Sequence, residues 1–148
     1  MPETGRRARG VLDTSVVIEL ERVDPGALPT ELAVSAITMA ELAAGPHATR
    51  DSDERARRQE RLQRAEATFE PLPFDAAAAR AYARVYTATL AAGRKARGQR
   101  AVDLLIAAIA LSLELALYTR NPHDFAALGD LLAVMAVPDP EPAPQRPV

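Results

Sequence analysis

One short stretch near the N-terminus narrows the possible folds: an apolar run interrupted by a single acid, GVLDTSVVI over residues 10–18. Its first half has the pattern of the end of a buried strand, and Thr14 or Ser15 can cap a helix that follows. Asp13 then lies where strand becomes helix. In open α/β sheets, ligands bind in the crevice beyond the carboxyl ends of the strands. A lone Asp at such a turn is also an ordinary helix cap, so this stretch by itself favours a structural role.

Strand-like and helical segments alternate along the rest of the chain. A short buried strand is expected over residues 32–35, before a helix over residues 37–44 that carries Glu41 and ends at Gly45-Pro46. Further helices are expected over residues 53–66, from Asp75 and from residue 101, and further strands over residues 69–72, 115–119 and 131–137. The alternation predicts an α/β fold with a central, mainly parallel sheet of four to five strands flanked by helices.

Length and composition indicate one globular domain. The chain has 148 residues, of which 48% are hydrophobic and 26% charged. Residues 1–9 predict a flexible segment without a signal peptide, and the proline-rich residues 138–148 predict a disordered tail, which leaves the domain to residues 10–137. The longest apolar run, residues 104–113, is well below the ~20 residues that span a bilayer. With no cysteine for disulfides or thiolate sites, a cytoplasmic location is expected.

Two helical segments contain residues that are common in nucleic-acid interfaces, but both have a simpler structural interpretation. The segment over residues 53–66 mixes arginines with glutamates, which is typical of a solvated helix with i,i+4 ion pairs rather than an RNA-binding stripe. The helix after Asp75 repeats Ala79, Tyr82, Tyr86 and Leu90 at helical spacing. These tyrosines are therefore expected to pack in the core.

A basic loop precedes the most apolar helix. The net charge of the chain is −2, so any basic surface must be local. The helix that starts at residue 101 is apolar on all sides after its first turn and must be buried. Asp103 lies at its N-terminal end, where an acid also complements the helix dipole, but this acid lies at the mouth of a buried element. Four cationic side chains come just before it: Arg94, Lys95, Arg97 and Arg100.

Acidic or amide side chains thus occur at four comparable positions: Asp13, Glu41, Asp103 and the turn with Asn121 and Asp124. Right-handed crossovers in a parallel sheet can bring such positions to one edge. Converging carboxylates repel one another and raise their pKa values unless a cation lies between them. Oxygen ligands alone favour magnesium or manganese, and such an ion can activate water and stabilise charge on a phosphodiester. The pattern predicts metal-assisted phosphodiester hydrolysis.

The same residues resemble the motifs of PIN-domain ribonucleases. Residues 12–18 (LDTSVVI) resemble the opening motif, 37–45 (ITMAELAAG) the second, 103–108 (DLLIAA) the third and 118–125 (YTRNPHDF) the last. Their order and spacing over roughly residues 10–137 are similar to those of the bacterial VapC toxins of type II toxin–antitoxin systems. Four motifs in order are far more specific than any one of them. The resemblance implies a three-layer PIN-like fold and a metal-dependent endoribonuclease.

The resemblance also implies roles for individual residues. Asp13 and Asp103 would be the main ligands of Mg²⁺, or of Mn²⁺, and Glu41 would bind the ion or hold its water. Thr14 or Ser15 would orient the Asp13 carboxylate or contact the substrate.

The fourth catalytic position is left open between two residues. Asp124 is the nearest carboxylate, whereas Asn121 stands where many relatives carry an acid or an amide. The basic loop is the candidate contact for RNA phosphates, with a solvated, unspecific turn as its alternative. The family further implies an antitoxin protein that blocks the site and a homodimer, with no membrane partner.

Other chemistries fit the sequence less well. An aspartyl-phosphate phosphatase would also start from Asp13, but Ser15 stands where that mechanism needs a second acid. The main alternative is a catalytically inactive PIN-like module that binds RNA or a protein. A degenerate site would have no reason to keep buried acids that repel one another, so the acids favour the nuclease.

Overall fold

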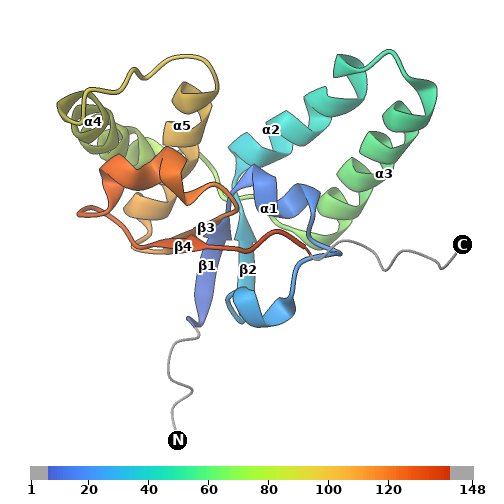
Figure 1. Ribbon diagram of the computed structural model, residues 1–148, viewed down its shortest axis with the longest axis horizontal. Coiled ribbons are helices and arrows are strands. Elements are labelled where there is room, and N and C mark those ends of the chain that lie inside the picture. The colour runs from blue at the N-terminus through green and yellow to red at the C-terminus, as the bar shows by residue number, and fades with distance from the viewer. Residues whose placement is uncertain (1–6, 141–148) are drawn as a thin grey trace, which may run out of the picture.

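The computed structural model describes residues 7–140, and Figure 1 shows its helices on either side of a central sheet. The strands β1 (Arg9–Leu12), β2 (Glu31–Val34), β3 (Ala116–Thr119) and β4 (Val134–Ala136) lie in the order β2-β1-β3-β4, and all neighbours are parallel. The helices are α1 (Thr14–Ile18), α2 (Ala36–Ala44), α3 (Ser52–Thr68), α4 (Ala76–Ala91) and α5 (Gln99–Ser112). The 3-10 helices are η1 (Pro25–Ala27), η2 (Gly45–Ala48) and η3 (Pro122–Leu128). The predicted α/β class and the parallel sheet are confirmed, with four strands.

The sheet separates two hydrophobic cores, because successive side chains of a strand point to opposite faces. On β1, Val11 packs into one core and Leu12 into the other, and Leu117 and Tyr118 alternate in the same way on β3. The first core lies against α4 and α5, and the second against α1 and α3. This arrangement confirms the predicted three layers. Within residues 7–140, no helix has both the length and the apolar character that crossing a membrane requires.

Several elements begin or end at other residues than predicted. Asp13 itself is the N-cap of α1, although its side chain makes no capping hydrogen bond. Neither Thr14 nor Ser15 therefore has the capping role that the sequence suggested. The expected edge strand over residues 69–72 is reduced to one parallel bridge between Leu72 and Ser35.

The predicted terminal segments lie partly outside the described residues, namely residues 1–6 and 141–148. The remaining part of the N-terminal segment is ordered, because Arg9 belongs to β1 and the carbonyl groups of residues 7 and 8 accept hydrogen bonds from the chain at the start of β2. At the other end, Asp139 pairs with Arg120 at 2.6 Å. The ordered chain therefore begins before Gly10, where the sequence analysis placed the start of the domain.

The predicted apolar face of α4 was wrong for Ala79, Tyr86 and Leu90, which are exposed, whereas Tyr82 is partly buried and packs against the first core. Tyr86 is 41% exposed and Leu90 48% exposed, and the centroid of the Tyr86 ring lies 6.0 Å from that of Tyr82. The buried face of the helix consists instead of Ala78, Ala81, Val85 and Thr89. Small side chains on this face let α4 pack closely against α5.

Gly10 is required by the packing of the two central strands. A Cβ atom at this position would overlap the Tyr118 ring, with Cδ2 at 2.7 Å, and would lie 3.2 Å from Pro29 Cγ. Because overpacking a core costs about 1–3 kcal/mol, Gly10→Ala is expected to lower the free energy of unfolding by that amount in urea denaturation. Gly129→Ala is the matched control, since its new Cβ would meet only Ala126 O at 3.8 Å. Equal stability of the two variants would contradict this account of Gly10.

Candidate active site

Asp13 lies at the carboxyl end of β1, where the sequence placed it. Its side chain is buried, at 5% exposure. Asp13 Oδ2 accepts hydrogen bonds from Ser15 Oγ and from Thr119 Oγ1, both at 2.8 Å. Thr119 reaches it from the end of β3, the strand that pairs directly with β1. Two hydroxyl groups therefore fix the orientation of the carboxylate, and Ser15 has the orienting position that was expected of Thr14 or Ser15.

Glu41 reaches the same end of the sheet from α2. Thr14 Oγ1 donates a hydrogen bond to Glu41 Oε1 at 2.6 Å and lies 2.9 Å from Thr38 Oγ1. Ser35 caps α2 by accepting a hydrogen bond from the Thr38 backbone N–H at 3.1 Å. These contacts join the start of α1 to α2. The Thr14 hydroxyl consequently orients Glu41, whereas Thr14 acts on the Asp13 carboxylate through a backbone hydrogen bond.

Asp103 projects from α5 toward the same acids. Its side chain is buried, although α5 begins only four residues earlier at Gln99. The Gln99 amide donates from one nitrogen atom to Asp103 Oδ1 at 3.1 Å and to Glu41 Oε2 at 3.2 Å. A single amide group therefore connects acids that belong to two different helices.

Burial and neighbouring charges both affect the ionisation of the acids. Desolvation raises the pKa of Asp103 to about 6, and the charges of Asp13, Asp124 and Glu41 act in the same direction. Desolvation is also the main reason that the pKa of Asp13 is raised, against hydrogen bonds that favour its charged form. The sequence analysis expected raised pKa values but assigned them to repulsion, which is the smaller cause. Glu41 and Asp103 share the Gln99 amide, and the charges of Asp13 and Asp124 also act on Asp103, so the four predicted acids lie in one region.

The donor chemistry of these residues fits a hard divalent cation, since carboxylate oxygens are the ligands that Mg²⁺ and Mn²⁺ prefer. In their present positions, however, no three acidic or histidine side chains within residues 7–140 are gathered as a metal site. The hydrogen bonds give a reason, because hydroxyl groups hold Asp13 while the Gln99 amide lies between Glu41 and Asp103. The acids share a region but not a common centre.

The fourth predicted position lies on and before η3. Asp124 is exposed, and its charge contributes to the raised pKa of Asp103. Asn121 uses its backbone N–H to donate to Thr119 Oγ1 at 3.0 Å and makes no side-chain capping bond. Of the two candidates, Asp124 is the one whose charge acts on the cluster.

The basic loop before α5 is attached to η3. Arg94 donates to the His123 carbonyl oxygen at 2.9 Å and lies 3.2 Å from His123 Nε2. Lys95 and Arg97 are exposed, and Arg100 is half-buried with no hydrogen-bond partner for its buried Nε. The contact with His123 holds the loop next to Asp124 and therefore beside the acids.

Comparison with known proteins agrees with this geometry. The family model of the PIN domain matches residues 10–131. The chain belongs to the PIN-domain family. Ribonuclease VapC5 of Mycobacterium tuberculosis is 40% identical to it over 130 residues, which is 86% of this chain and 93% of the relative.

Solved structures similar to this PIN domain include VapBC-5, a member of the VapBC family of toxin–antitoxin systems from Mycobacterium tuberculosis. It has a TM-score of 0.76 and 39% identity, and the match covers 89% of this chain and 99% of the other. FitAcB from Neisseria gonorrhoeae has a TM-score of 0.66 and 30% identity, over 84% and 95% of the two chains. The resemblance stated from the four sequence motifs is thereby confirmed.

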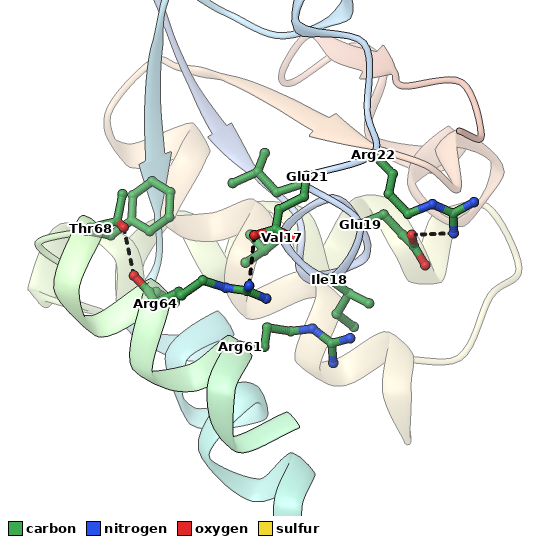
Figure 2. Close-up of a pocket in the computed structure, with 11 residues that line it drawn as sticks. Val17, Ile18, Glu19, Glu21, Arg22, Arg61, Arg64 and Thr68 are labelled. Carbon is green, nitrogen blue, oxygen red and sulfur yellow. Dashed lines mark hydrogen bonds and ion pairs between the residues drawn. The ribbon is translucent and has the colours of Figure 1, made fainter. Parts of the chain in front are cut away.

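A groove lies between α1 and α3 of the PIN domain, and Figure 2 shows its lining. Its volume is about 400 Å³. A neighbouring hollow of about 460 Å³ shares Ile18, Glu19 and Arg61 with it and is also lined by Thr14 and Glu41. The two hollows together form a path along α3 that ends at one of the acids.

The mixed-sign helix α3 has the structural role that its sequence predicted. Arg57 and Arg58 pair with Glu54 at 2.8 and 3.0 Å. Arg64 reaches across the groove to Glu21 at 2.9 Å (Figure 2). Because these pairs lie at the protein surface, where water screens the charges, they contribute little to stability. Arg61 also lines the groove, and it makes no ion pair with any residue in the described part of the chain.

The sequence analysis did not identify two residues of the site, Thr119 and Gln99. The parallel register pairs Leu12 with Tyr118, so the residues that follow them, Asp13 and Thr119, must also be neighbours. Gln99 lies four residues before Asp103, a spacing that places both side chains on one side of a helix. Both residues were therefore detectable once the strand pairing and the start of α5 were known.

Proposed function

We propose that this PIN domain is a metal-dependent endoribonuclease that hydrolyses RNA phosphodiester bonds and acts as the toxin of a toxin–antitoxin pair. The observation that carries the proposal is the convergence of Asp13, Glu41, Asp103 and Asp124 at one end of the parallel sheet, with the first and third buried. The names of two relatives support it, since one is a ribonuclease and the other belongs to a toxin–antitoxin system.

Asp13 and Asp103 would hold Mg²⁺ or Mn²⁺, together with Glu41, and Asp124 would complete the acidic set. When bound, such an ion supplies an activated water and stabilises the charge that develops on the phosphate. The chain itself orients the acids through the hydroxyl groups of Ser15, Thr119 and Thr14. The ligands must be deprotonated to bind a cation, so metal binding is expected to weaken as the pH falls and Asp103, whose pKa is raised by burial, takes up a proton.

The RNA is proposed to approach along the basic loop. Cationic side chains bind the phosphate backbone without regard to sequence, and the Arg94 contact with His123 keeps the loop beside Asp124. The proposed phosphate contacts are Arg94, Lys95, Arg97 and Arg100.

An antitoxin protein is proposed to bind in the groove between α1 and α3. The groove combines apolar side chains such as Ile18 and Phe69 with charged ones, and it leads into the hollow at Glu41. A partner segment bound there would reach the acids and block them. A homodimer and a cytoplasmic location are further parts of this proposal.

The proposal is tested by RNA cleavage with the purified protein. Cleavage is expected with Mg²⁺ or Mn²⁺, and none after chelation with EDTA. Asp13→Asn is expected to lose the activity, because it removes one ligand charge, whereas Asp130→Asn, at an exposed position, is expected to keep it. Cleavage that survives both chelation and Asp13→Asn would contradict the metal mechanism. Tight binding of RNA or of a partner without any cleavage would favour the inactive module instead.

A further inference from the structure

Gln99 makes hydrogen bonds to two of the proposed metal ligands at once. Its Nε2 atom lies 3.1 Å from Asp103 Oδ1 and 3.2 Å from Glu41 Oε2. Hydrogen bonds to ionised acceptors are about twice as strong as neutral ones. The amide therefore holds two carboxylates together that would otherwise repel each other across the space between α2 and α5.

The amide nitrogen and a divalent ion require the same carboxylate oxygens. Magnesium binds oxygen ligands at about 2.0–2.1 Å, and an N–H donor directed at those oxygens leaves no place for an ion between them. The acids within residues 7–140 are also not gathered around a common centre in this arrangement. The contacts of Gln99 and those of a bound ion are consequently alternatives.

The position of Gln99 allows its side chain to move away. It is an exposed residue at the first position of α5, and Gly98 before it has φ of +60° with nothing within 4 Å of an added Cβ. We propose that Gln99 is a positioning residue that acts as a displaceable substitute for the cation: it holds Glu41 beside Asp103 in the ion-free protein and swings out when the ion binds. This inference rests on the proposed function, because it requires that these acids bind a divalent ion.

The test is a calorimetric titration of the full chain with Mn²⁺, combined with the melting temperature of the ion-free protein. Gln99→Ala removes the amide, and Gln99→Met removes it while keeping the length of the side chain. If the swung-out state has a population of about one tenth, both variants bind Mn²⁺ about tenfold more tightly than the parent. Their ion-free melting temperatures fall by about 3 °C, because two hydrogen bonds to acids are lost.

Gln63→Ala is the matched control, since Gln63 is an exposed glutamine on α3 that lies outside the site. This variant should keep the Mn²⁺ affinity of the parent and the contacts among the acids of the site. Unchanged or weaker Mn²⁺ binding by both Gln99 variants, with normal binding by the parent, would overturn this inference and leave the proposed function intact. If the parent itself binds no Mn²⁺, the proposed function fails and this inference fails with it.

Discussion

Asp103→Asn is expected to raise the melting temperature of the ion-free protein while it removes RNA cleavage. Burial holds the pKa of Asp103 at about 6, compared with an ordinary value of 3.8. Keeping this group ionised at pH 7.5 therefore opposes folding by up to about 3 kcal/mol. Asparagine carries no charge and can still accept the Gln99 hydrogen bond, so a gain of about 5–10 °C is expected. Loss of a metal ligand should lower the cleavage rate about 100-fold or more.

The pH dependence of this gain distinguishes charge from any general packing effect. Between pH 3.8 and about 6, the folded protein retains a proton on Asp103 that the unfolded chain has released. Raising the pH through this interval therefore lowers the stability of the parent more than that of Asp103→Asn, in which only Asp13 keeps a pKa raised by burial. Thermal melts in EDTA should show nearly equal melting temperatures below pH 4 and the largest difference above pH 6. A variant that is less stable than the parent at pH 7.5, or a difference that does not vary with pH, would contradict the assignment.

Mn²⁺ is expected to raise the melting temperature of the parent protein strongly. An ion that binds only the folded state, at a concentration 100 times its dissociation constant, stabilises that state by about 2.7 kcal/mol. For a domain of this size the expected shift is about 10 °C. Asp103→Asn should show no such response, because it lacks one of the two main proposed ligands, whereas Asp130→Asn should respond like the parent.

Two controls separate specific binding from general ionic effects. Sodium chloride at matched ionic strength should give a small shift in all variants, since salt screens only the exposed charges. An undiminished Mn²⁺ response in Asp103→Asn would place the ion elsewhere in the protein. Measurement by differential scanning fluorimetry at pH 7.5 keeps Asp103 deprotonated in the parent.

The sequence predicted most of the fold because its elements have strong local signals. The apolar strands, the Asp75 cap of α4 and the buried α5 all follow from periodicity and capping, and each is present. The face of α4 could not be found in this way. Alanine is only weakly hydrophobic, so the sequence pattern placed Tyr86 and Leu90 on the buried face of α4. Close packing against α5 instead requires the small side chains on another face of the helix.

The candidate site was predictable in outline but not in its contacts. Asp13 follows a strand, Asp103 lies near the start of a helix and Glu41 lies within a helix after a strand, and these positions in an α/β pattern predicted that the three acids lie at one edge of the sheet. The pairing of each hydroxyl group with its acid depends on the strand register and on how closely α2 approaches α1. A single sequence reveals neither of these. The sequence therefore left the orienting role open between Thr14 and Ser15, and it singled out neither Thr119 nor Gln99.

The central position of β1 has a consequence for protein synthesis. Its neighbour β3 and the helix α5 belong to the last third of the chain, so they leave the ribosome long after Asp13 and Glu41 do. A nascent chain that ends before residue 99 has neither Asp103 nor the Thr119 hydroxyl, and β1 is then an edge strand without its second partner. Domains generally fold as units during synthesis. The proposed nuclease activity is therefore expected only after residue 119 has been synthesised, and products that end before residue 99 are expected to be inactive.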